Sequence, residues 1–98
     1  DMAYLIHFRP ARMTREQYER IHEELDRIGL GNQPERPFHV GFGLEDHIEV
    51  IDIWTSLEAF HSFGEALMPI IEAVGVQIGT PHVHTVQRLQ VPGVLTEA

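Results

Sequence analysis

The segment Val50–Phe63, VIDIWTSLEAFHSF, constrains the fold more than any other part of this chain. It starts with an apolar strand pattern and passes through Thr55 and Ser56 into a helical pattern, with almost no loop between them. Thr55 and Glu58 have the spacing of a capping box, in which each side chain bonds to a backbone N–H of the other residue. The second helix is therefore predicted to begin directly after Thr55.

Asp52 lies inside this strand pattern, among Val50, Ile51, Ile53 and Trp54. An ionised carboxylate in a protein core is unfavourable by several kcal/mol unless a partner compensates its charge. We therefore expect either a solvated face on this strand or a dedicated hydrogen-bond donor for Asp52.

Alternating and helical periodicities divide the rest of the chain into six elements. Thr14 and Gln17 form a second capping-box pattern at the start of the first helix, and Pro69 predicts a kink or break of the second helix near Met68. The predicted strands are Ala3–Phe8, Phe38–Gly43, His47–Trp54 and His82–Val91, and the predicted helices are Arg15–Ile28 and Leu57–Val74.

The element order βαββαβ predicts an α+β, ferredoxin-like domain with a four-stranded antiparallel sheet. A chain of 98 residues has room for one such domain, with residues 92–98 as a tail after it. The third strand is apolar on both faces, so the sheet face away from the helices needs a cover. The simplest cover is a second copy of the sheet, which predicts a homodimer that closes into a dimeric α/β barrel.

Composition excludes several classes of function. The formal net charge of −8 argues against nucleic acid, whose phosphates such a chain repels. The chain has no cysteine, no signal-peptide pattern after Met2 and no apolar run long enough for a membrane span, so we expect no membrane association and a cytoplasmic protein. Seven histidines are many for this length, and they direct attention to acid–base chemistry.

The segment Asp52–Phe63, with a Trp, then Thr-Ser, then Glu-Ala-Phe, resembles the antibiotic-biosynthesis monooxygenase-like superfamily of dimeric α/β barrels. A further run, Ala66–Val76, resembles the end of the second helix in an uncharacterised branch of that superfamily. The resemblance implies the same fold. It also implies cofactor-free oxygenation of phenolic polyketides, cyclisation or isomerisation of similar substrates, or oxidative breakdown of haem.

The haem-degrading members use an Asn on the first strand, a Trp on the third strand and a His on the second helix. Trp54 matches the Trp, but His61 follows it too closely to match the His well. His7 stands on the first strand where an Asn is wanted, and Asn32 lies in a loop. These departures place haem binding or haem breakdown third among the functions considered.

Three residues are the candidate catalytic groups. His39 is the candidate base, because its strand neighbours Gly41 and Gly43 leave space for a ligand on the same face. Asp52 is its candidate partner, since a carboxylate beside a histidine selects the tautomer and raises the basicity of the ring. His7 is the third candidate, and structural burial with satisfied hydrogen bonds is the alternative interpretation for all three.

The candidate substrate-binding residues are Trp54, Tyr18, Phe60 and His84, for which packing in the core or on an edge strand is the alternative. His82 and His84 alternate along the last strand, as two metal ligands would, but a third ligand has no sequence support. We therefore predict no metal and no cofactor.

The leading hypothesis is a small cofactor-independent enzyme, of monooxygenase, cyclase or isomerase type, that acts on an aromatic or polyketide-like molecule. The alternative is a non-catalytic dimeric protein that binds a ligand or has a structural role. A pocket of about a few hundred cubic ångströms between the helices and the sheet, lined by His39 and Asp52, would favour the enzyme. Closed hydrogen bonds with no adjoining space would favour the alternative.

Overall fold

The structure, a computed structural model, describes residues 2–91 and has the predicted element order βαββαβ. The tail predicted from Pro92 lies outside the described residues. The strands are β1 (Tyr4–Phe8), β2 (Phe38–Leu44), β3 (His47–Trp54) and β4 (His82–Thr85), and the helices are α1 (Arg15–Arg27) and α2 (Leu57–Val74).

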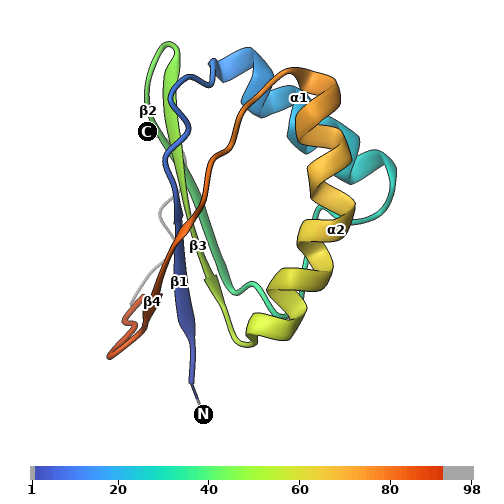
Figure 1. The fold of residues 1–98 in the computed structure, drawn as a ribbon. Coiled ribbons are helices and arrows are strands. Elements are labelled where there is room, and N and C mark those ends of the chain that lie inside the picture. Colours follow the sequence, from blue (N-terminus) through green and yellow to red (C-terminus); the bar gives the residue numbers. More distant parts are fainter. Residues whose placement is uncertain (1, 92–98) are drawn as a thin grey trace.

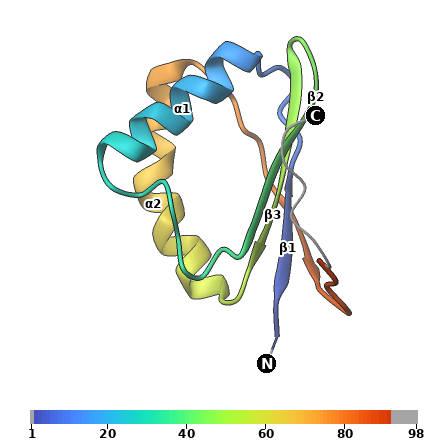
Figure 2. The ribbon, with the colours of Figure 1, turned by 180° about the vertical axis from the view of Figure 1, so that it is seen from behind.

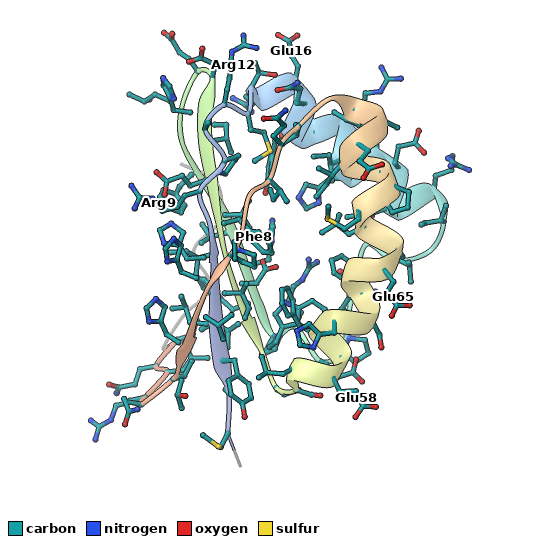
Figure 3. The ribbon with its side chains drawn as sticks, viewed as in Figure 1. Phe8, Arg9, Arg12, Glu16, Glu58 and Glu65 are labelled. Carbon is teal, nitrogen blue, oxygen red and sulfur yellow. The ribbon has the colours of Figure 1, made fainter. Side chains whose placement is uncertain are left out.

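The four strands form one antiparallel sheet in the order β2-β3-β1-β4. Both helices lie on the same face of this sheet, as the two opposite views show (Figures 1 and 2). Consecutive side chains at the end of β1 point to opposite sides of the sheet. Phe8, the last residue of β1, points toward the helices, and Arg9, which follows it, points away from them (Figure 3). The ferredoxin-like α+β prediction is therefore confirmed.

The strand register places the predicted polar residues on the helix side of the sheet. Ile6 of β1 pairs with Asp52 of β3, and Asp52 pairs with His39 of β2. Directly paired residues share a face, and Ile6 is fully buried under the helices. His39 and Asp52 thus lie side by side beneath α1 and α2.

Helix α1 begins as predicted. The Thr14 hydroxyl accepts the backbone N–H of Gln17 at 3.0 Å, and the Gln17 side chain accepts the N–H of Thr14 at 2.9 Å, which completes the capping box. The helix buries Ile21 and Leu25 against the sheet and α2. Its amphipathic sequence therefore presents one face to the core and the other to solvent.

The predicted capping box at Thr55 is wrong. Ser56 is the N-cap of α2, and its hydroxyl accepts the backbone N–H of Ala59 at 3.1 Å. Thr55 is held elsewhere, because its own N–H donates to the carbonyl of Glu35 at 2.8 Å. This bond ties the end of β3 to the loop before β2, a contact between distant segments that local spacing does not reveal.

The expected break at Pro69 does not occur, and α2 is continuous from Leu57 to Val74. Pro69 removes the hydrogen bond to the carbonyl of Glu65. Both residues lie on the exposed side of the helix, where water can solvate that carbonyl. Glu65 and Glu58 project away from the core (Figure 3). The apolar contacts of Phe60, Phe63 and Ile71 hold the other side of the helix to the core.

The last strand is much shorter than predicted, because β4 ends at Thr85. Thr85 pairs with Tyr4, the first residue of β1, and the N–H of Val86 donates to the carbonyl of Ala3 at 2.8 Å. Beyond this point β1 offers no further partner. The apolar residues Leu89 and Val91, which suggested a longer strand, are exposed.

The core lies between the helices and the sheet, where Ile6, Met13 and Trp54 are the most completely buried large side chains. The other sheet face, which we call the open face, carries partly buried apolar residues, among them Leu5, Val40 and Ile51. No helix in the described part of the chain has the length and apolar character needed to cross a membrane.

Candidate functional site

A hydrogen-bonded Asp–His pair lies at the centre of the helix side of the sheet. The Asp52 residue is only 4% exposed, and its Oδ1 lies 2.5 Å from Nδ1 of His39. The strand register makes the two residues direct neighbours on β3 and β2. Asp52 therefore has a dedicated donor, which is one of the two arrangements that its burial required.

Tyr18 extends this pair into a chain of three groups. Its hydroxyl lies 2.8 Å from Nε2 of His39, and the two rings are parallel with centroids 6.0 Å apart. When the ionised Asp52 accepts the Nδ1–H of His39, Nε2 carries the lone pair and accepts the Tyr18 proton. The geometry thus selects one imidazole tautomer.

Burial raises the pKa of Tyr18, and the negative charges of Glu19 and Asp52 raise it further, against a smaller opposing effect of Arg36. The phenol is therefore protonated at neutral pH, and it can donate to His39. Tyr18 and His39 both line the space between the helices and the sheet.

Gly41 accounts for the position of the Tyr18 ring. A Cβ atom at Gly41 would clash with the ring of Tyr18 and lie 2.5 Å from its hydroxyl oxygen. The bare strand face predicted from Gly41 and Gly43 thus exists, but a side chain of the same protein occupies the space over Gly41. Gly43 has a positive φ of 122° near the β2–β3 turn, where its role is conformational.

Arg36 brings a positive charge to the same site from the loop before β2. Its side chain is 8% exposed, and its Nη1 lies 4.0 Å from Oδ2 of Asp52. The guanidinium lies over the rings of Trp54 and Phe63, at 6.0 and 5.4 Å from their centroids. Its Nη2 donates to the carbonyl of Gly31 at 3.1 Å, which holds the loop to the cation.

His22 lies one helical turn after Tyr18 and packs edge-on against both Tyr18 and His39. Burial lowers the pKa of His22, and the nearby His39 and Arg36 lower it further, whereas Glu19 and Asp26 act in the opposite direction. His22 is therefore an uncharged imidazole at neutral pH.

A cavity of about 50 Å³ adjoins these groups. Its polar lining comes from Tyr18, His22, Arg36, His39 and Asp52, and apolar side chains form the remainder. An apolar cavity of about 150 Å³ can hold benzene. The present cavity is therefore large enough for a small polar group or a few atoms of a ligand, but too small for a whole aromatic ring.

A separate surface depression shares the side chains of Tyr18 and His22 with the cavity. It lies between α1 and the β2–β3 hairpin, and it is also lined by Gly41, Phe42 and Gly43. Tyr18 and His22 thus stand between the inner cavity and an open part of the surface.

The structure brings together three of the predicted site residues, His39, Asp52 and Tyr18, and separates the others from them. His7 is on the open face of the sheet, where its Nε2 lies 2.7 Å from Oε1 of Glu49. His84 is exposed on β4 and pairs with Leu5, on the same open face. The sheet therefore lies between these two histidines and the cavity.

Trp54 and Phe60 also stand outside the cavity lining. Trp54 is fully buried and packs against Phe60 and Phe63, and its Nε1 has no hydrogen-bond partner within residues 2–91. Phe60 packs between Trp54 and Phe8. Trp54 acts on the site indirectly, because it supports the guanidinium of Arg36.

Two residues of the site, Arg36 and His22, were not predicted from the sequence. The spacing of four residues between Tyr18 and His22 places both on one helix face, and this signal could have identified His22. No local pattern identifies Arg36, because its position depends on the path of the loop between α1 and β2.

Comparison with solved structures places this arrangement in a known fold. The structure is similar to that of SnoaB, a cofactor-independent oxygenase from Streptomyces nogalater, with 14% sequence identity over 93% of this chain and 95% of that chain and a TM-score of 0.55. The chain has the antibiotic-biosynthesis monooxygenase-like fold. At this level of identity, the likeness establishes the fold alone.

A second structure with this antibiotic-biosynthesis monooxygenase-like fold comes from Deinococcus radiodurans, and it is provisionally described as an antibiotic biosynthesis monooxygenase. It has 10% identity to this chain, covers 97% of this chain and 100% of that chain, and gives a TM-score of 0.51. No protein-family model and no curated protein sequence matches this chain.

The lowered pKa of His22 leads to a prediction about stability. Between its ordinary value near 6.5 and the lower folded value, the unfolded chain binds a proton that the folded chain excludes. The free energy of unfolding should therefore fall as the pH drops through this window. Urea unfolding at about pH 7.5 and about pH 5.5 should show a smaller difference for His22→Gln than for the wild type. The control His61→Gln, on the exposed side of α2, should keep the wild-type change in the free energy of unfolding between the two pH values. The same change in His22→Gln as in the wild type would contradict the lowered pKa of His22.

Proposed function

We propose that this protein is a small cofactor-independent enzyme that removes a proton from an aromatic or polyketide-like molecule. The observation that carries the proposal is the Asp52–His39–Tyr18 chain at the wall of a cavity. Such a chain is suited to general acid–base chemistry, because a buried carboxylate stabilises the imidazolium that forms when His39 takes a proton. The fold shared with a cofactor-independent oxygenase supports the same class of reaction.

Each member of the chain has a distinct role in this proposal. Asp52 accepts the Nδ1–H of His39 and keeps the lone pair on Nε2. Tyr18 bonds to Nε2 and lines the cavity, so it passes its proton to His39 as its oxygen takes one from the substrate. The product of this step is a substrate anion, which can react with dioxygen, cyclise, or take the proton back at another position in an isomerisation.

The size of the cavity determines how a substrate must bind. Because about 50 Å³ does not hold an aromatic ring, only the acidic group of the substrate enters the cavity. The remainder lies in the surface depression over Phe42 and Gly43, and Tyr18 and His22 shift to connect the two spaces. Substrate binding therefore includes a side-chain movement on α1.

The second candidate function is a non-catalytic protein that binds a ligand or has a structural role. Both ring nitrogens of His39 have partners, which is the arrangement expected of a purely structural buried histidine. The cavity is lined by His39 and Asp52, as the enzyme requires, but its volume of about 50 Å³ is below the few hundred cubic ångströms typical of a substrate pocket. The chain of three hydrogen-bonded groups is what supports the enzyme over this alternative. A haem group is far larger than the cavity, and His61 is on the exposed surface of α2, so no contact of this site favours haem.

The test is a comparison of variants on a panel of hydroxylated anthrones and naphthols. Substrate C–H exchange with D₂O, followed by NMR, reports proton removal, and an oxygen electrode reports oxygenation separately. We expect His39→Gln and Asp52→Asn to lower kcat between about 100-fold and about 10,000-fold. Tyr18→Phe should also lower kcat, whereas the surface control His61→Gln should not.

Two outcomes of this comparison would contradict the proposal. Full turnover by His39→Gln would remove His39 from the role of base. Saturable binding of a panel member by the wild type with neither exchange nor oxygen uptake would identify a binding protein instead.

We also propose that the protein is a homodimer that pairs through the open face of the sheet. Val40 and Ile51 are direct partners at the centre of this face, and Ile51 also pairs with His7. Phe42 at its edge is 38% exposed. An apolar, partly exposed sheet face of this kind is typical of an interaction surface, and a second copy offers a face of matching shape and character.

Ile51→Glu tests this dimer, because it places a charge at the centre of the open face while the core on the other side stays unchanged. Analytical ultracentrifugation should show a dimer for the wild type and a monomer for Ile51→Glu. Arg20→Glu, an exposed position on α1, should remain dimeric. A monomeric wild type, or a dimeric Ile51→Glu variant, would contradict the proposed interface.

A further inference from the structure

Arg36 is a buried cation that the proton-transfer chain does not use. Its side chain lines the cavity and is only 8% exposed. Arginine is almost never this deeply buried unless its charge is paired, because desolvation of a guanidinium is costly. The partners of Arg36 therefore decide whether its charge is already neutralised or is available to a ligand.

The pairing of Arg36 with protein groups is loose. Its charge partner among the described residues is Asp52, whose Oδ2 is 4.0 Å from Nη1 and thus beyond hydrogen-bond distance. The other carboxylate oxygen of Asp52 is engaged at 2.5 Å by His39. The bond from Nη2 to Gly31 and the aromatic rings of Trp54 and Phe63 hold the guanidinium in place without removing its charge.

The balance of charge around the cavity changes when His39 takes a proton. In the form that can accept a proton, the His39 ring is neutral, and the charges of ionised Asp52 and Arg36 cancel. After the step, the imidazolium and Arg36 face a single carboxylate, so the site carries one net positive charge. An anion in the cavity restores neutrality, and in this low-dielectric setting the attraction is much stronger than in water.

The other elements around the cavity leave this balance unchanged. From α1, the cavity is lined by the polar side chains of Tyr18 and His22, both of which are uncharged at neutral pH. From α2 it is lined by Phe63, Leu67 and Ile71, which carry no charge. Arg36 is therefore the nearest fixed positive charge to a group that enters the cavity.

We propose that the cavity binds the oxyanion of a weak acid, with the guanidinium of Arg36 as the hydrogen-bond donor to the anionic oxygen. This inference rests on the proposed function and names its substrate class: a phenol or an enolisable carbonyl compound that is bound as its anion. The proton leaves the ligand oxygen or carbon, passes through Tyr18 and ends on Nε2 of His39. Arg36 thus stabilises the charge that this transfer creates.

The coloured acid 4-nitrophenol tests this inference directly, because its ionised form has a separate absorption band. At a pH one unit below the solution pKa of the probe, the wild type should produce the nitrophenolate band upon binding. We expect the apparent pKa of the bound probe to fall by about one unit or more, which corresponds to about tenfold tighter binding of the anion than of the neutral acid. Formate, which is small enough for the cavity, should raise the melting temperature of the wild type.

Variants of Arg36 separate the charge from the packing. Arg36→Met keeps most of the apolar contacts without the charge, and it should lose both the band and the protection by formate. Arg36→Lys should keep part of each effect. Arg27→Met, which removes an exposed guanidinium from α1, should behave as the wild type does.

The wild type alone can overturn the inference, even if an Arg36 variant does not fold. Binding of nitrophenol without ionisation, or no response to either probe, would contradict it, as would an unchanged band in Arg36→Met. The proposed enzyme has a separate test: lost turnover in His39→Gln with no ionisation of the probe would keep the enzyme and reject the anion site. Ionisation of the bound probe with no turnover of any substrate would keep the anion site and reject the enzyme.

Discussion

The buried carboxylate of Asp52 is the constraint on which the site depends. A charge at 4% exposure requires partners, and these come from two segments that the chain must bring to the centre of the sheet. His39 arrives through the register of β2 on β3, and Arg36 through the loop immediately before β2. A slip of one residue in this register would move His39 to the open face and leave Asp52 without its donor. The Asp52–His39 hydrogen bond and the strand register thus support each other.

The tight packing of Tyr18 has a consequence for access. Its ring fills the space that Gly41 leaves, and its hydroxyl occupies the lone pair of His39. Nε2 of His39 is therefore engaged in a hydrogen bond, and the inner cavity is small. Under the proposed function, both features make substrate entry depend on α1, which carries Tyr18 and His22 on one face.

Local patterns in the sequence were sufficient for most of the fold and for the centre of the site. The bounds of β3, the capping box at Thr14 and the shared face of His39 and Gly41 follow from spacing alone. Asp52 was identified because a carboxylate in an apolar strand requires a donor. The shorter β4 and the bond from Thr55 to Glu35 did not follow, because each is a contact with a distant segment. Arg36 was missed for the same reason, since no repeat or motif marks a loop residue that folds back over the core.

The most direct test of this account is the protonation pattern of the His39 ring in the free protein. Long-range ¹H–¹⁵N NMR correlations distinguish a protonated from an unprotonated ring nitrogen. In the neutral ring, the two hydrogen bonds place a proton on Nδ1, directed at Asp52, and a lone pair on Nε2, directed at Tyr18. A proton on Nε2 with none on Nδ1 would contradict this account, because Asp52 would then lose its donor and His39 would have no lone pair with which to accept a proton through Tyr18.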